Sequence, residues 1–467
     1  MDTSALLGSI AAQRWFAGRG SVVTDVTILD HVKLDPGPPD LILALARVTG
    51  SDKTTALYQM PLLVDVKTVV GDAFTDVSRL GVLGRLMAGG ESLKGRKGVF
   101  SFSGPGLNPL DPPGGKSARA LKGEQSNSSL VLDNRFFIKI FRRLGAGSNP
   151  DVELNRLLTN EGFDGVPPQV GEITYRGSLD GAKNTYDLAI AQRVVGRAKD
   201  GWTHVLNDVR SLLYSANEQV TGRERRQYVE SHSAETLARL EELGDRTAAL
   251  HVFLARDDFP PEFSPEPARP ADLRSWASST RSWLKRLSET ALRPATVEQT
   301  KALLEELRTV PDRGTKMRIH GDYHLGQTLL SRRGWSIIDF EGEPTRSLEE
   351  RRKKHSPLKD VAGILRSLSY ASTISLFEQT LPRAAQAEPW ADTWEAAARD
   401  HFLVGYRRRS YEGHFLPKDN RSRSLVLAYF ELDKALYEIN YEQTHRPDWI
   451  RVPMRGLRTI LRRRRRR

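Results

Sequence analysis

The hydrophobic pattern changes character near residue 200, and this change constrains the fold more than any other feature of the 467-residue chain. Before it, β-branched and apolar runs such as Val22–Asp30 and Leu41–Val48 alternate with Gly- and Pro-rich turns, a pattern typical of strands. After it, long amphipathic segments predict helices at Glu235–Leu254 and Leu425–Tyr441. Because the chain is too long for one small core, we expect two or three subdomains.

The segment before residue 200 has a mixed α/β pattern. Two apolar runs, Ser129–Leu132 and Phe136–Phe141, flank an Asp-Asn turn and predict a β-hairpin. A helix is expected at Asp151–Asn160 and a further strand at Tyr186–Val195. The Pro- and Gly-rich stretch Ser101–Lys116 predicts a loop or linker.

Composition excludes several classes of protein. The chain has no cysteine, which rules out a disulfide framework, a thiolate nucleophile and Cys-ligated zinc. No apolar run reaches about 18 residues, so we expect no membrane span. The first residues carry Asp2 and no basic region, unlike a signal peptide. These features together favour a cytoplasmic protein.

The chain is basic, with a formal net charge of +12, of which six charges belong to the terminal run Arg462–Arg467. Such a run is typical either of a disordered, solvated tail or of a segment that binds nucleic acid or an anionic membrane. The body has no RNA-binding signature, so we do not expect a nucleic-acid partner. A modestly basic body also suits a protein that handles a polyphosphate.

The strongest chemical signal is the stretch His320–Gln327 (HGDYHLGQ), followed by a short apolar run that ends in Asp339. Phosphoryl transfer to a hydroxyl needs a carboxylate to orient the hydroxyl and accept its proton, and oxygen ligands for a metal ion. In kinase-like enzymes the base and an amide ligand lie five residues apart on one loop, as Asp322 and Gln327 do. We therefore predict Asp322 as the base, with Gln327 and Asp339 as Mg²⁺ ligands.

A second signal is Lys139, which interrupts the apolar strand Phe136–Phe141. Burying a lysine is costly unless it is paired. Pairing with nucleotide phosphates and with Glu153 on the next predicted helix would explain its position. The alternative is an edge-strand lysine whose ammonium group reaches solvent.

Two further segments complete the predicted nucleotide site. The polar turn before the hairpin, Glu124–Ser129, lies where a loop covering phosphates would be, with Ser126, Asn127 and Ser128 as hydrogen-bond donors. A Ser/Asn-rich turn without a ligand is the simpler interpretation. By order along the chain, the strand containing Gln192 and Val194 would hold the adenine.

At this point the chain resembles a known family, the maltokinases. The resemblance is carried by RWFAGR near the N-terminus and by EQSNSSLVLDNRFFIKIFRRLGAGSNPDVELNRLL, HGDYHLGQ, IDFEGEPTRSLEERRKKHSPLKDVAGILRSLSYA and YEINYEQTHRPDWIRVP. It runs over nearly the whole chain. It is weakest at residues 50–120 and in the Arg run.

The resemblance implies an α+β, two-lobed protein-kinase-like fold, similar to aminoglycoside phosphotransferases, with an N-terminal cap and a mostly helical C-lobe. On this basis we expect a cap at 1–110, a nucleotide-binding N-lobe at 111–200, a C-lobe at 201–461 and a basic tail at 462–467. The implied reaction is ATP- and Mg²⁺-dependent conversion of maltose to maltose 1-phosphate, which feeds α-glucan and glycogen synthesis. The family also suggests association with a trehalose synthase.

The acceptor side is less determined. The helix predicted at Leu425–Tyr441 has a polar face on which Glu431, Glu438 and Tyr441 are candidate sugar ligands. The alternative is a surface helix stabilised by a Glu431/Lys434 pair. Glu341, directly after the metal ligand Asp339, is a further candidate for the acceptor site.

Asp360 lies in the first turn of the next predicted helix and is open to two interpretations. It either ties down the catalytic loop, through His320, or acts as a first-turn carboxylate favoured by the helix dipole.

Two other functions compete with the maltokinase interpretation. A sister group within the resemblance phosphorylates glucosamine, and an amino-sugar or aminoglycoside kinase would share every motif above. A cationic acceptor needs several carboxylates in its pocket, whereas a disaccharide needs a longer, more aromatic groove. A pseudokinase would lack the base, the lysine or a metal ligand, and all of these are present.

Overall fold

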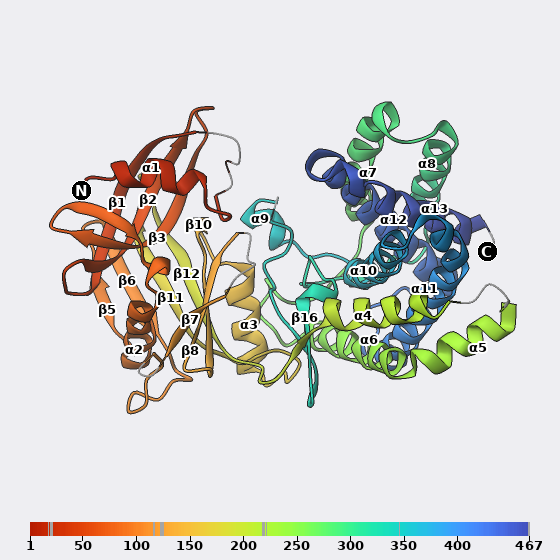
Figure 1. Ribbon diagram of the computed structural model, residues 1–467, viewed down its shortest axis with the longest axis horizontal. Helices are drawn as coiled ribbons and strands as arrows, with labels where there is room; N and C mark the ends of the chain where they lie inside the picture. Colours follow the sequence, from red (N-terminus) through yellow and green to blue (C-terminus); the bar gives the residue numbers. More distant parts are fainter. Residues whose placement is uncertain are drawn as a thin grey trace. The chain divides into compact units, whose positions relative to one another are not determined.

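The computed structural model describes residues 1–465 except 17, 19–21, 115–116, 122–125, 217–219, 221 and 345. The chain divides into two compact units, residues 1–196 with 344–351, and residues 197–343 with 352–467. The first contains two antiparallel sheets and few helices, and the second is mostly helical (Figure 1). This is the α+β class that we predicted. The finer domain boundaries given above remain predictions.

The first unit contains a five-stranded and a seven-stranded sheet. The five-stranded sheet has the order β1-β2-β3-β10, with β4 on β3, and consists of β1 (Val23–Asp35), β2 (Asp40–Gly50), β3 (Thr55–Asp65), β4 (Thr68–Asp72) and β10 (Arg143–Leu144). The seven-stranded sheet has the order β5-β6-β11-β12-β9-β8-β7 and consists of β5 (Ser92–Lys94), β6 (Gly98–Ser103), β7 (Ala118–Ala120), β8 (Ser128–Leu132), β9 (Phe136–Ile140), β11 (Gln169–Ser178) and β12 (Lys183–Arg193). The helices of this unit are α1 (Ser4–Ala11), α2 (Gly81–Gly89), α3 (Pro150–Asn160) and α9 (Leu348–Arg351).

Strand β2 explains how the five-stranded sheet is covered on both faces. Its side chains alternate between two cores, as the period of two in a strand requires. Leu41, Leu43 and Leu45 pack in a core shared with the seven-stranded sheet. Ile42 and Ala44 face a second core that includes α1. A strand buried on both faces reads as a continuous apolar run, which is what the sequence shows.

The predicted hairpin forms as expected. Strands β8 and β9 pair in antiparallel register, and both Asp133 and Asn134 have positive φ. Asp and Asn tolerate this left-handed conformation, which a tight hairpin turn requires. The loop predicted at Ser101–Lys116 starts slightly later than expected, because β6 runs to Ser103 and pairs with β11.

The second unit is built from helices around two small sheets. Its helices are α4 (Gly201–Tyr214), α5 (Gly222–His232), α6 (Ala234–Leu254), α7 (Pro270–Thr290), α8 (Pro294–Arg308), α10 (Leu358–Phe377), α11 (Leu381–Ser410), α12 (Asn420–His445) and α13 (Arg451–Arg465). Its strands are β13 (Lys199–Asp200), β14 (Glu266–Pro267), β15 (Thr315–Lys316), β16 (Thr328–Ser331) and β17 (Gly334–Ile337), where β13-β16-β17 and β14-β15 form the sheets. Among the described residues, no helix combines the length and apolar character that a bilayer span requires.

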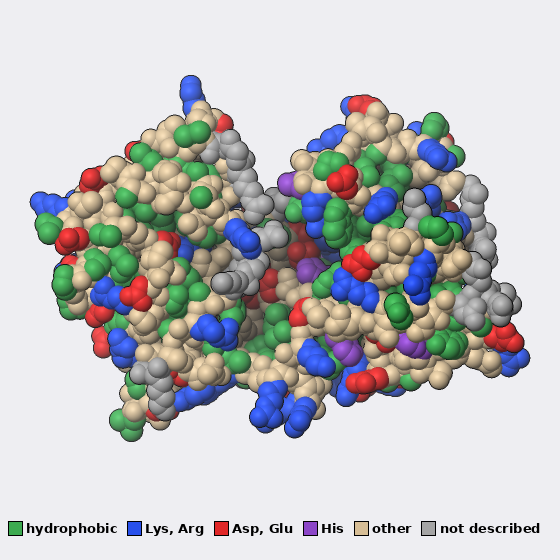
Figure 2. Space-filling model, in the orientation of Figure 1, with side chains coloured by type: hydrophobic (Ala, Val, Ile, Leu, Met, Phe, Trp, Pro, Cys, Tyr) green, Lys and Arg blue, Asp and Glu red, His purple; other side chains and the backbone are tan. Residues whose placement is uncertain are grey.

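The C-terminal arginine run differs from the solvated tail that its composition favoured. Helix α13 continues to Arg465, so at least four of the six arginines are helical. Arg463 donates to Glu395 at 2.9 Å, and Arg464 pairs with Glu306. The carboxylates of neighbouring helices therefore anchor this segment. On the face drawn in Figure 2, Lys and Arg side chains lie among Asp and Glu on both units, without a continuous basic stripe among the described residues.

Candidate active site

The first unit holds the predicted nucleotide lysine in a buried ion pair. Lys139 lies on β9, and its ammonium group is 3.0 Å from Asp151 Oδ2 on α3. Both side chains are almost fully buried, so the lysine is not the solvent-reaching type of an edge strand. We predicted Glu153 as the partner. The structure adds Asp151, which our sequence reasoning missed, while the role of the buried Glu153 remains a prediction.

A chain of polar contacts fixes this pair between α3 and β12. The Asn155 amide donates to Asp151 Oδ1 at 2.8 Å and to the Asp151 carbonyl at 2.7 Å. Its side-chain oxygen accepts from Gln192 Nε2 at 3.0 Å. A buried polar network whose members are satisfied rigidifies its surroundings. The Gln192 side chain thus connects β12 with α3, and its predicted contact with adenine remains untested.

The other predicted nucleotide residues lie around the same hairpin. Glu124 is outside the described residues. Ser128 accepts from Arg142 Nε at 2.7 Å, and Arg142 also binds Asp72 through two hydrogen bonds. The Val194 amide donates to the Arg135 carbonyl at 2.9 Å. Hydrogen bonds within the protein therefore engage the Ser128 hydroxyl and the Val194 N–H.

Beside them, the Asn127 side chain donates to Ser126 Oγ at 3.2 Å. Contacts of Ser126, Asn127 and Ser128 with phosphate, and of Val194 with adenine, stay predictions.

Helix α3 also positions a buried acid, Asp187 of β12. Asp187 Oδ2 accepts from the Asn149 amide at 2.7 Å, at the N-terminus of α3. Burial raises the pKa of Asp187 to about 6, although this hydrogen bond acts in the opposite direction. Nearby Glu153 and Glu172 also favour the protonated form.

In the second unit, the predicted catalytic loop is the stretch His320–Gln327, a short segment between β15 and β16. Its shape depends on His320, whose Nδ1 is 3.4 Å from the Asp322 amide and whose Nε2 is 2.8 Å from the Ile338 carbonyl. Since a carbonyl can only accept, Nε2 carries the proton and Nδ1 is the acceptor. His320 thereby ties the catalytic loop to the segment that leads to Asp339.

One face of α10 supports this loop at three points spaced along the helix. Asp360 accepts from the amides of His320 and Gly321 at 2.8 and 2.9 Å, and Ser367 Oγ accepts from the Leu325 amide at 3.2 Å. Between them, a Cβ on Gly363 would lie 2.1 Å from the Tyr323 carbonyl. Residues three to four apart share a helix face. The interpretation of Asp360 as an anchor of the catalytic loop is confirmed, although the bond is to the backbone of His320.

Asp360 keeps its charge although it is buried. Burial alone would raise the pKa of Asp360, but hydrogen bonds from His251 and from the Gly321 amide lower it below its usual value. His251 Nε2 is 3.3 Å from Asp360 Oδ2, and its Nδ1 is 2.8 Å from the Tyr406 hydroxyl. A carboxylate that accepts several N–H groups is a strong anchor, because its ionised form is the one that is bound.

The predicted base Asp322 pairs with a lysine from a distant part of the chain. Lys434 Nζ on α12 is 2.9 Å from Asp322 Oδ1 and 3.8 Å from Glu343 Oε1. Burial would lower the pKa of Lys434, but the charges of Asp322 and Glu343 outweigh it and raise that pKa. Lys434 is therefore a permanent cation that holds the Asp322 carboxylate in one orientation. In the sequence analysis, Lys434 appeared only as the partner of Glu431 in the surface-helix alternative.

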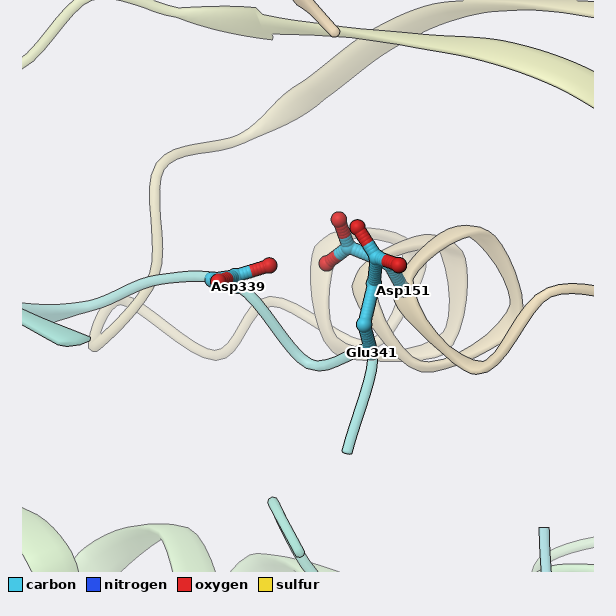
Figure 3. A group of neighbouring side chains, drawn as sticks. All are labelled: Asp151, Asp339 and Glu341. Carbon is cyan, nitrogen blue, oxygen red and sulfur yellow. The ribbon is translucent and has the colours of Figure 1, made fainter. Parts of the chain in front are cut away.

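The predicted metal ligands also come together. Gln327 Nε2 donates to Asp339 Oδ2 at 2.7 Å, and Asp339 has a φ of 69°, a left-handed conformation that is uncommon for non-glycine residues. Figure 3 shows the Asp339 and Glu341 side chains on the segment that follows β17. Their carboxylate oxygens lie within 4.8 Å of each other. Carboxylate and amide oxygens are the ligands that Mg²⁺ prefers, so this donor set fits that ion.

Two of the predicted sugar ligands on α12, Glu431 and Glu438, form ion pairs with arginines. Glu431 pairs with Arg399 through both carboxylate oxygens, and Glu438 accepts from Arg366 at 2.6 and 3.0 Å. These ion pairs join α12 to helices α10 and α11, and their side chains are between 3% and 12% exposed. The simpler interpretation of Glu431 as an ion-pair partner therefore has support, but with Arg399. Tyr441 stacks on His445 with ring centroids 4.3 Å apart.

The comparisons with known proteins agree with this fold and site. The model of the phosphotransferase enzyme family matches residues 177–401, which include the catalytic loop and α10. The protein is therefore a phosphotransferase enzyme with a protein-kinase-like fold. The maltokinase N-terminal cap domain matches residues 10–87. The chain thus combines a maltokinase-type cap with a phosphotransferase domain, which confirms the resemblance seen in the sequence.

Similar proteins of known activity share most of the chain. It is 26% identical over 359 residues to a glucosamine kinase of Streptacidiphilus jiangxiensis, covering 73% of each protein. It is 25% identical to a glucosamine kinase of Mycolicibacterium smegmatis, covering 74% of this chain and 80% of that one. A solved glucosamine kinase, in complex with glucosamine, ADP and inorganic phosphate, aligns with a TM-score of 0.66 and 21% identity over 97% of this chain and 99% of that one. At that identity the structure shows a common fold.

Proposed function

We propose that this protein transfers the terminal phosphate of ATP to a sugar hydroxyl, and that its acceptor is maltose, which becomes maltose 1-phosphate for α-glucan and glycogen synthesis. The observation that carries the proposal is the position of Asp322, on a loop that α10 anchors at three points and in an ion pair with Lys434. A base in phosphoryl transfer acts mainly by orienting the acceptor hydroxyl. Such a fixed carboxylate suits that task.

The residues of each unit have their own part in this proposal. Asp322 accepts the proton of the sugar hydroxyl, and Gln327 and Asp339 hold Mg²⁺. The metal ion supplies neutralisation of the phosphate charge. Lys139 binds the phosphates of the nucleotide, with its ammonium group oriented by Asp151.

The charges on α12 favour a neutral acceptor. An amino sugar carries an ammonium group, which needs a carboxylate that is not already neutralised. Arg399 and Arg366 neutralise Glu431 and Glu438, and Lys434 places another positive charge directly beside Asp322. Like charges in a half-buried site repel each other, so this arrangement supports maltose over glucosamine.

Glucosamine phosphorylation is the second candidate, because the curated relatives described above are glucosamine kinases. The matched phosphotransferase segment ends at residue 401, before α12 begins at Asn420, so the helix with the candidate acceptor residues lies outside it. Glu341 and Tyr441 remain candidates for contact with either sugar. A cytoplasmic location and association with a trehalose synthase are further predictions from the resemblance.

The test is a panel of acceptors. The protein is incubated with MgATP and, separately, maltose, glucosamine, glucose and an aminoglycoside, and release of ADP is measured against a reaction without acceptor. We expect turnover with maltose that exceeds turnover with the other acceptors. Turnover confined to glucosamine would replace maltose as the substrate, and absence of turnover with every sugar would contradict the proposed reaction.

A further inference from the structure

A large cavity lies in the helical unit, lined by α8, α11, α12, α13 and the start of α10. Its volume is about 930 Å³, near the upper end of the range for small-molecule sites. Helices α8, α12 and α13 lie side by side in this unit (Figure 1). Its described lining contains no residue of the catalytic loop or of the segment from 327 to 343. The cavity is therefore separate from the candidate active site.

The lining is strongly positive. Four of its seventeen residues are arginines, Arg407, Arg421, Arg423 and Arg464, and only Glu306 carries a negative charge. Glu306 is already paired with Arg464. Among the described residues, the other three arginines form no ion pair with a carboxylate.

The few hydrogen bonds of these three arginines leave their charges uncompensated. Arg407 donates to the Leu403 carbonyl at 3.1 Å, and Arg423 donates to the carbonyls of Pro417 and Lys418 and to Asn420 Oδ1. The cavity also meets the first turn of α12, whose Ser422 amide is capped by the Asp419 carboxylate, a residue outside the lining. Several arginines gathered without carboxylates are typical of a site for an anion.

The lining of the cavity also has an apolar part. Eight of the lining residues are aliphatic, among them Leu303, Val361 and Leu461, which are buried. An inorganic ion would fill only a small part of this volume and would leave the aliphatic wall without a contact. The combination fits an organic anion with a flat or apolar body, such as an aromatic phosphate of roughly nucleotide size.

A chain of side-chain contacts connects the lining of the cavity with Asp360, which anchors the catalytic loop. Tyr406 lines the cavity, and its hydroxyl is 2.8 Å from His251 Nδ1. His251 contacts Asp360, and Asp360 holds the amides of His320 and Gly321. The helix residues Leu358 and Val361, which flank Asp360, are also part of the lining. A molecule in the cavity would therefore contact the residues that position the catalytic loop.

We propose that this cavity binds a small organic anion with an apolar body, at a site distinct from the phosphotransfer site, and that its occupancy changes the catalytic rate through Tyr406. The binding part is independent of the proposed function, whereas the effect on rate depends on it. Binding at one site can alter another only if the ligand favours one arrangement of the residues between them.

The binding test uses the dye 8-anilinonaphthalene-1-sulfonate, which has an anionic group on an aromatic body. We expect saturable fluorescence enhancement on the folded, full-length protein, and displacement of the dye by 1-naphthyl phosphate but not by inorganic phosphate at equal concentration. Arg421→Ala and Arg407→Ala should each weaken dye binding about tenfold, because each removes a charge-assisted contact. Leu427→Trp should weaken binding by narrowing the cavity while retaining every arginine.

Arg458→Ala is the matched control, since Arg458 is an exposed arginine on α13 outside the cavity lining. Its dye affinity should equal that of the wild type, and thermal unfolding verifies that each variant is folded. Dye binding that is unchanged in both Arg421→Ala and Leu427→Trp, or that is not saturable, overturns the site.

The second measurement compares the phosphotransfer rate with and without 1-naphthyl phosphate in the wild type and in Tyr406→Phe. We expect a severalfold change of kcat in the wild type and no change in Tyr406→Phe, which retains the ring and the dye site but lacks the hydroxyl that contacts His251. An equal response in both proteins overturns the route through Tyr406. Because dye binding is measured by fluorescence, this test of the site does not require an active enzyme.

Discussion

Each unit contains a lysine–carboxylate pair, and the two pairs differ in how far their side chains are exposed to solvent. The Lys139 and Asp151 side chains are 6% and 2% exposed, and Asn155 and Gln192 tie them into a network. The Lys434 and Asp322 side chains are 22% and 21% exposed. A buried pair maintains its geometry with help from its neighbours, whereas a partly open pair leaves room for a substrate to reach the carboxylate.

The sharpest test of this contrast is Asp322→Asn. We expect kcat to fall by about three orders of magnitude, because the amide keeps the size of the side chain but can no longer accept the hydroxyl proton. The melting temperature should change little, since the side chain is partly exposed. Steady-state release of ADP and thermal unfolding measure the two effects.

Asp258→Asn is the matched control, because Asp258 is an exposed carboxylate paired with Arg256. It should leave turnover unchanged. Near-wild-type turnover in Asp322→Asn would remove Asp322 from the mechanism.

Removal of the cation in the open pair should have a smaller effect. In Lys434→Met, Asp322 keeps its charge but loses the contact that orients it, so we expect kcat to fall about tenfold to a hundredfold. Lys434→Arg retains the charge and should recover part of the rate. If both variants lose activity equally, the geometry of the lysine matters rather than its charge; if neither does, Lys434 does not position Asp322.

The two pairs also show what the sequence could and could not predict. The hairpin, Lys139 and the spacing of Asp322, Gln327 and Asp339 are local patterns, and the resemblance added the fold class. The sequence missed Asp151 because two carboxylates lie two residues apart on α3. Which of them faces β9 depends on the rotation of the helix, and the spacing does not fix that rotation.

Lys434 was missed for a different reason, because 112 residues separate it from Asp322. The apolar stripe on α12 indicated one buried face, and the charged face was interpreted either as a sugar-binding face or as a solvent-exposed one. In the structure Glu431 and Glu438 on that face are largely buried, because they meet Arg399 and Arg366 from other helices. Periodicity of apolar residues cannot reveal a helix face that is buried through ion pairs.

The buried pair should respond differently from the open one. Lys139→Ala is expected to weaken ATP use, with a higher KM for ATP, and to lower the free energy of unfolding by about 3 kcal/mol, because the buried Asp151 carboxylate loses a cation. In the double variant Lys139→Ala with Asp151→Asn, part of the stability should return while ATP use stays impaired. Unchanged KM and kcat for ATP in Lys139→Ala would refute its role with the nucleotide.

The last expected effect is on stability alone and concerns the acid next to this pair, Asp187. Its pKa is raised to about 6 in the folded protein from an ordinary value of 3.8, so between these values the folded state holds a proton that the unfolded chain has released. Stability therefore falls as the pH rises from about 4 to 6, and above that range the charge costs about 3 kcal/mol. Asp187→Asn removes the charge while its side-chain oxygen can still accept from the Asn149 amide.

We expect denaturant unfolding of Asp187→Asn and the wild type to give similar stabilities near pH 4 and to favour the variant by about 3 kcal/mol at pH 7. Asp180→Asn, which changes an exposed carboxylate of the same unit paired with Arg47, should show no such divergence. A wild type that is as stable as Asp187→Asn at pH 7 would mean that the network around α3 accommodates the charge. The buried region would then tolerate a charge better than its packing indicates. In that case, solvent exposure would not explain the difference between this region and the open Lys434–Asp322 pair.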